Sequence, residues 1–156
     1  MVSPAAKLIG TTHYNFNTYP GVVSFDLQIP NFSSTQGKYT VFELPYFSNL
    51  ISQIKVIDNR QTTLWQDEKI SLTYLWNIAI PANQKVVNIM PKKLEIGSRN
   101  TARFIRTVEN KGNNLQIKIK LELPIDEVTL DKYRILEQIQ RKLADPAERN
   151  IILTWR

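Results

Sequence analysis

The segment from Ile70 to Pro81 constrains the fold more than any other part of the sequence. It reads ISLTYLWNIAIP, and apolar residues occupy every second position from Ile70 to Ile80. A period of two is typical of a β-strand with one buried face. Pro81 ends the run because proline has no N–H to donate to a β-ladder. We therefore expect a long central strand whose apolar face lines the core.

Similar alternation recurs along the chain, and several of the runs end at a proline. We expect an edge strand at residues 13–19, further strands at 23–29, 39–44, 50–57 and 86–90, and a polar loop at 31–37. This punctuation favours an all-β fold, a β-sandwich of about seven to nine mostly antiparallel strands. The chain has 156 residues, enough for a single domain over 1–156, with residues 1–10 as a flexible lead-in.

The segment from Arg103 to Leu123 predicts a hairpin. Its turn is NKGNN, in which Gly112 can adopt a positive φ, and its second arm alternates cleanly from Leu115 to Leu123. A turn centred on Gly112 places Arg103 opposite Lys120 on the solvent face and points Phe104 inward.

The period changes after Pro124. Tyr133, Leu136, Ile139 and Leu143 are spaced by three or four residues, which predicts one amphipathic helix over 130–145, packed on a sheet edge or face. Thr129 or Asp131 could cap its start, and Asp145-Pro146 ends it. The last apolar run, residues 150–154, is expected as a final strand at a sheet edge.

Charge and composition exclude several classes of protein. The net charge is +6, and all of the excess lies in residues 85–156, which hold fifteen Lys/Arg against nine Asp/Glu, whereas residues 1–84 hold five of each. No apolar run approaches the roughly 18 residues of a membrane span. The first residues lack the apolar core of a signal peptide, so we expect either a cytosolic protein or a piece of a longer exported chain.

The residues needed for catalysis are scarce. The sequence has no cysteine, and its one histidine is His13, so neither a thiol nucleophile nor a histidine-based zinc site can be assembled. The acidic pairs at 67–68 and 126–127 are sequence neighbours whose side chains diverge, and no glycine-rich phosphate loop is present. We predict no catalytic, cofactor-binding or metal-binding residue and no enzymatic activity.

Two kinds of residue could instead form a binding surface. Trp65 and Tyr46 are candidates for stacking against a glycan, although a loop tryptophan more often plugs the end of a sandwich. A basic cluster could bind a polyanion, yet outward lysines also keep an apolar strand from aggregating, so nucleic acid is not favoured. The candidate binding surface comprises Arg60, Trp65, Tyr46, Lys92, Lys93, Arg103, Lys118 and Lys120.

The order of several motifs carries a family resemblance. Six motifs follow one another in the sequence: the run YTVFELP at 39–45, Arg60 within DNRQTTL, the strand 70–81, Met90-Pro91, the strand 115–122, and Tyr133 with Leu136 and Ile139. Together they resemble the C-terminal β-sandwich domain of bacterial transglutaminase-like envelope proteins, which belong to the papain-like superfamily.

The resemblance implies a function. In that family the catalytic Cys, His and Asp belong to a middle domain, and nothing in this sequence matches them. It implies a non-catalytic accessory domain, part of a larger periplasmic or cell-surface protein, whose partners are neighbouring domains of the same chain or another protein. The alternative is a glycan-binding β-sandwich module.

Overall fold

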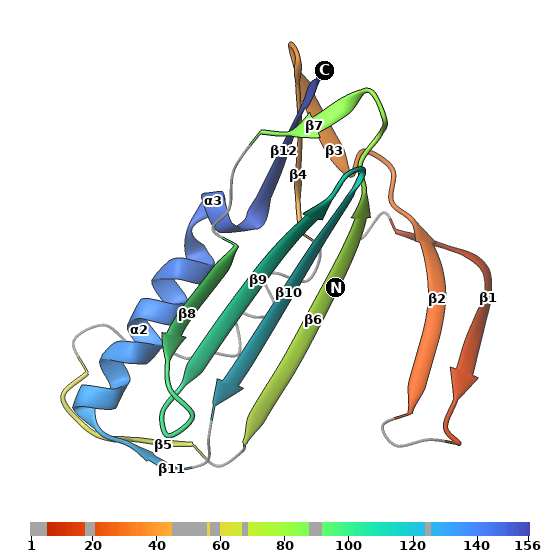
Figure 1. Ribbon diagram of the computed structural model, residues 1–156. Helices are drawn as coiled ribbons and strands as arrows, with labels where there is room; N and C mark the ends of the chain where they lie inside the picture. The colour runs from red at the N-terminus through yellow and green to blue at the C-terminus, as the bar shows by residue number, and fades with distance from the viewer. Residues whose placement is uncertain are drawn as a thin grey trace.

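The computed structural model describes residues 6–17, 21–44, 56, 60–66, 69–87, 92–123 and 126–156. In this part the chain forms twelve strands and the helices α2 and α3 (Figure 1). Every strand pairing within it is antiparallel. The all-β, sandwich-like fold with a C-terminal helix is therefore confirmed. The twelve strands exceed the predicted seven to nine, and three of them, β5, β7 and β11, have only three residues each.

The main sheet has the order β6-β10-β9-β8. Its strands are β6 (Ile70–Ala79), β10 (Asn114–Leu123), β9 (Arg103–Lys111) and β8 (Lys93–Gly97). The predicted alternation in β6 is confirmed, but its central position is wrong: among the described residues β6 pairs with β10 alone, at the edge of the sheet. Its inward residues are half-buried for the same reason. A period of two reveals a strand's two faces and says nothing about its neighbours.

The β9–β10 hairpin turns through two residues. Lys111 pairs with Asn114, and Gly112 takes a φ of +65° at the first central position, as a type II′ turn requires. Arg103 therefore lies opposite Glu122, and the prediction that it faces Lys120 is wrong because the turn is not centred on Gly112. Phe104 is buried, as predicted.

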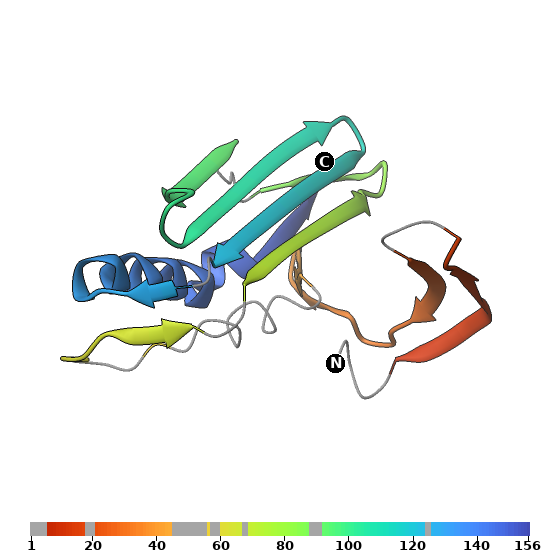
Figure 2. The same ribbon diagram turned by 90° about the horizontal axis from the view of Figure 1, so that it is seen from below.

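Helix α2 (Leu130–Ala144) covers the inner face of the main sheet. Figure 2 shows it beneath the sheet. All four residues predicted for its apolar stripe are buried, and they join the inward residues of β9 and β10 in one core. Thr129 takes the N-cap position, but its hydroxyl contacts the Asp131 carboxylate (2.5 Å) and does not cap the helix. Asp145 instead caps the short α3 (Pro146–Arg149) by accepting a hydrogen bond from the Ala147 N–H (2.9 Å).

The second sheet has the order β3-β4-β12-β7. Its strands are β3 (Ser33–Gln36), β4 (Tyr39–Glu43), β12 (Asn150–Trp155) and β7 (Gln84–Val86). Two predictions are wrong here. Residues 33–36 form a strand although a loop was expected, because a strand exposed on both faces carries no apolar alternation. Strand β12 lies between β4 and β7 and is therefore not at a sheet edge.

Two small ribbons complete the fold. Strands β5 (Leu64–Gln66) and β11 (Asp126–Val128) pair beside the N-terminal end of α2. Strands β1 (Lys7–Asn15) and β2 (Val22–Gln28) form a hairpin that lies to one side of the main sheet. Residues 7–10 belong to β1, so the predicted lead-in over 1–10 is wrong for them. The strand predicted at 50–57, apart from Val56, and the end of that at 86–90 lie outside the described residues.

Candidate binding surface

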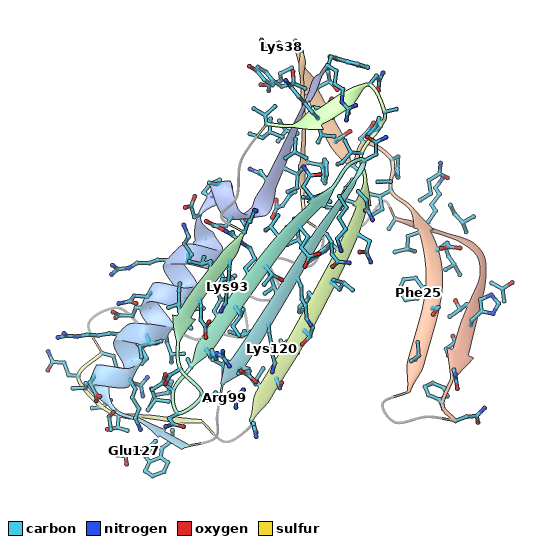
Figure 3. All side chains as sticks on the ribbon, viewed as in Figure 1. Phe25, Lys38, Lys93, Arg99, Lys120 and Glu127 are labelled. Atoms are coloured by element: carbon cyan, nitrogen blue, oxygen red, sulfur yellow. The ribbon has the colours of Figure 1, made fainter. Side chains whose placement is uncertain are left out.

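The outer face of the main sheet brings four of the predicted residues together. Alternation directs Lys118 and Lys120 outward from β10, and the strand register aligns Lys118 with Thr107 of β9 and Lys93 of β8. Arg103 lies on the same face, opposite Glu122. Figure 3 labels Lys93 and Lys120 on this sheet. The cluster predicted from sequence is therefore a real group of neighbouring side chains.

Carboxylates on the same face compensate most of these charges. Glu95 pairs with Lys93 (2.9 Å) and with Arg103 (2.6 Å). Glu122 pairs with Lys120 (2.6 Å) and, at 3.7 Å, with Arg103. The hydrogen bond from Lys93, followed by that from Arg103, lowers the pKa of the Glu95 carboxyl. Such alternation of sign is typical of a solvated sheet face and leaves little uncompensated charge for a polyanion.

Lys118 and Lys92 complete the predicted basic cluster. Both side chains are exposed, and neither forms an ion pair with another residue in the described part of the chain. Two isolated surface ammonium groups add little to binding unless a ligand engages both. The basic cluster is thus mainly a network of surface ion pairs.

Arg60 has an internal role. Its Nε donates to the carbonyl of Thr62 (2.7 Å) and its Nη2 to that of Thr63 (3.0 Å). The guanidinium group also lies 5.7 Å from the ring centroid of Tyr133 on α2, within the range of a cation–π contact. The structure therefore brings together two residues of the family resemblance, and Arg60 ties the segment before β5 to the helix.

Trp65 is the most prominent exposed aromatic residue of the predicted set. It is 69% exposed on β5 and lies opposite Glu127 of β11. Its strand neighbours Leu64 and Val128 pack against the core, which holds the ribbon in place. The tryptophan therefore does not plug the sandwich. Tyr46, its expected partner in stacking, lies outside the described residues.

An apolar cleft of about 680 Å³ lies where the end of β6 faces the second sheet. Phe32 and Phe42 form one wall, and Leu75 and Ile78 belong to the other. Sequence patterns could not reveal it, because its walls come from segments far apart in the chain.

A buried ion pair was missed at the sequence level. Arg106 of β9 is 0% exposed and pairs with Glu148 of α3, which also contacts Lys142 (2.7 Å). Burial lowers the pKa of the Arg106 guanidinium. A signal was present, because Arg106 occupies an inward position of β9 between Phe104 and Val108.

Metal-binding chemistry has no visible basis in the described part of the chain. No group of three or more His, Asp or Glu side chains gathers there, and His13 lies exposed on β1. No helix among the described residues is long and apolar enough to cross a membrane.

Comparison with known families assigns this chain to a protein family. Residues 37–153 match the model of a domain of unknown function with a solved structure, DUF3858. The chain belongs to the DUF3858 family. The matched span includes the main sheet, both helices and most of the second sheet, and it excludes β1 and β2. No curated protein matches this chain.

A solved structure shares the DUF3858 fold. It is the crystal structure of a Parabacteroides distasonis protein described as a "putative protease", with a TM-score of 0.63 and 14% sequence identity. The match covers 77% of this chain and 24% of that one. The chain thus spans about a quarter of that protein, and at this identity the likeness concerns the fold alone.

Proposed function

We propose that this chain is a non-catalytic accessory domain of a transglutaminase-like exported protein, located in the periplasm or at the cell surface. One observation carries the proposal: the DUF3858 span, residues 37–153, contains neither cysteine nor histidine. Acyl transfer by a Cys–His or Ser–His pair needs a histidine base. Any such chemistry must therefore be performed outside this span.

The comparison with a larger protein also supports an accessory domain whose catalytic partner lies elsewhere in the chain. In the Parabacteroides distasonis protein the shared fold occupies 24% of the chain, so most of that protein lies outside it. In our proposal this chain likewise docks against a neighbouring domain or a protein partner. The internal use of Arg60, which holds two carbonyls and the Tyr133 ring, agrees with a structural role.

An activity assay tests the non-catalytic part of the proposal. The purified chain is incubated with a casein-type peptide mixture and, separately, with a glutamine peptide and a fluorescent amine. We expect no hydrolysis and no amine incorporation above the buffer blank. Turnover that persists through repeated purification and changes with a substitution in this chain would overturn the proposal.

The genomic reading frame tests the proposal that this chain is an accessory domain of a larger protein. We expect the frame to continue upstream of Met1 into a papain-like domain with Cys, His and Asp, preceded by a signal peptide. A stop codon directly upstream would contradict the proposal and favour a free-standing protein.

The exposure of Trp65 favours a second candidate function, glycan binding. A surface tryptophan beside the Glu127 carboxylate offers a stacking face and hydrogen-bond acceptors for sugar hydroxyls. Titration with soluble oligosaccharides tests it through calorimetry. Trp65→Ala should abolish the heat of binding, while Trp155→Ala, which removes another exposed tryptophan (51%) elsewhere on the surface, should not. Equal loss in both variants, or no heat in the unaltered chain, would reject glycan binding.

A further inference from the structure

The hairpin formed by β1 and β2, here called the arm, has one apolar face that the other described residues leave largely exposed. Leu8 lies opposite Leu27 and Tyr14 opposite Val23, and residues paired in this way share a face. Phe25 joins them, two residues from both Val23 and Leu27. The side chains of Leu8, Tyr14, Val23 and Phe25 are 56%, 66%, 45% and 46% exposed.

This exposure conflicts with the sequence pattern and with the stability of hairpins. Residues 23–29 alternate like a strand with one buried face, yet the arm stands apart from the main sheet in both ribbon views (Figures 1 and 2). Within the described chain β1 and β2 pair only with each other. A two-stranded hairpin is marginal in water unless further strands or a packing surface cover its apolar face. Among the residues that the structure describes, the arm therefore has no partner surface.

We propose that the apolar face of the arm packs against the same face of a second copy of this chain. Two hairpins stacked face to face form a four-stranded, two-layered unit with the roughly 10 Å spacing of packed sheets. The same patch serves both copies, as a two-fold dimer requires. In Figure 3 the labelled Phe25 marks the middle of this face on β2.

The area available suits a weak, concentration-dependent dimer. A fully buried aromatic side chain covers roughly 150–250 Å². Scaled by the exposed fractions, Tyr14, Phe25 and Phe16, which is 71% exposed and in ring contact with Tyr14, offer roughly 370 Å² per copy. Two copies would bury about 730 Å² of aromatic surface, to which Leu8 and Val23 add a smaller part, and this lies within the range of weak, transient interfaces.

Charge also favours the arm over the rest of the surface. Between residues 7 and 28 the only charged residues are Lys7 and Asp26, whose charges cancel. The whole excess of +6 therefore belongs to the remainder of the chain. Two copies repel one another through their basic bodies and can approach through their neutral arms.

Sedimentation and light scattering over a range of concentrations test the proposal. We expect the unaltered chain to pass from monomer to dimer as concentration rises. Phe25→Lys should keep it monomeric at every concentration, because two lysines would then face one another in the interface. Ser24→Lys is the matched control, since it adds the same charge on the opposite face of the same strand, and it should still dimerise.

Three results would overturn the proposal. They are a strictly monomeric unaltered chain, an arm that folds back on its own body, or a dimer that Phe25→Lys leaves unchanged.

Since the chain has no cysteine, a single introduced thiol reports on the contact directly. Val23→Cys should be linked between copies by a bismaleimide with a reach of about 10 Å, and Ser24→Cys should not. Equal linking of both variants would contradict face-to-face packing, and oligomers larger than dimers would contradict two-fold pairing.

Discussion

At the scale of the residue, the Arg106–Glu148 pair shows how a charge is retained in this core. Arg106 projects from β9 into the space under α2, and its Nε and Nη2 have no hydrogen-bond acceptor in the described part of the chain. Its charge is therefore met mainly by Glu148 at the start of α3. A buried charge that keeps its partner is tolerated, and one that loses its partner is strongly unfavourable.

We predict that Glu148→Ala lowers the free energy of unfolding by about 3–5 kcal/mol, because Arg106 remains buried without its partner. The double variant Arg106→Met with Glu148→Leu should recover most of this loss. Urea denaturation followed by circular dichroism measures both, with the exposed Glu127→Ala as the control. If Glu148→Ala costs no more than the control, the ion pair does not compensate the buried guanidinium.

At the scale of the element, the turn between β8 and β9 depends on a glycine. Gly97 ends β8 with a φ of +81°, and a β-carbon there would collide with the carbonyl of Ala102 and press on Ile135 of α2. Gly112, in the β9–β10 turn, has a φ of +65° but open space around it. Only the absence of a side chain allows β8, its turn and α2 to approach so closely.

These two glycines give a matched comparison. Gly112→Ala should cost about 1–2 kcal/mol, the penalty of a left-handed conformation for alanine. Gly97→Ala should cost about 2–5 kcal/mol, because the collision adds about 1–3 kcal/mol of overpacking. Chemical denaturation of both variants gives the difference. Equal costs would show that the Ala102 contact relaxes without penalty.

The ion pairs on the outer face of the main sheet make stability depend on pH. The pKa of Glu95 is lowered below 4.5 in the folded chain, first by Lys93 and then by Arg103. This carboxylate therefore stabilises the fold fully above about pH 4.5 and loses the contribution as pH falls through its lowered pKa. We predict that Tm declines more steeply in this acidic window for the unaltered chain than for Glu95→Gln. Parallel Tm profiles would refute the contribution of Glu95.

At the scale of the whole molecule, the chain divides into a DUF3858 body and the arm. The core lies between the main sheet, α2 and the second sheet, and none of its buried residues comes from β1 or β2. The family match also begins after the arm, at residue 37. The body should therefore fold without it.

We predict that removal of residues 1–30 shifts Tm by less than about 4 °C in dilute solution, the change that roughly 1 kcal/mol produces in a domain of this size. Scanning calorimetry of the shortened chain measures the shift. A larger loss, or failure to fold, would mean that the arm contributes to the core.

The secondary structure and the faces of its elements followed from local pattern to a large extent. The alternation in β6 and β10, the helical stripe of α2 and the inward position of Phe104 could all be predicted, because a side chain's direction depends on backbone period alone. The candidate site was predictable only as a set of residues. Its outward lysines were recognised, but the carboxylates that neutralise them become neighbours through strand register.

The sequence by itself determined the β-rich class, the apolar faces and the lack of cysteine, since these depend on residue identity and on spacing along one chain. Tertiary structure alone decided that β6 lies at an edge, that β12 lies inside its sheet, that Arg60 contacts Tyr133 and that Arg106 meets Glu148. Each of these joins segments distant in sequence. Their pairing minimises the free energy of the whole fold, which no local pattern encodes.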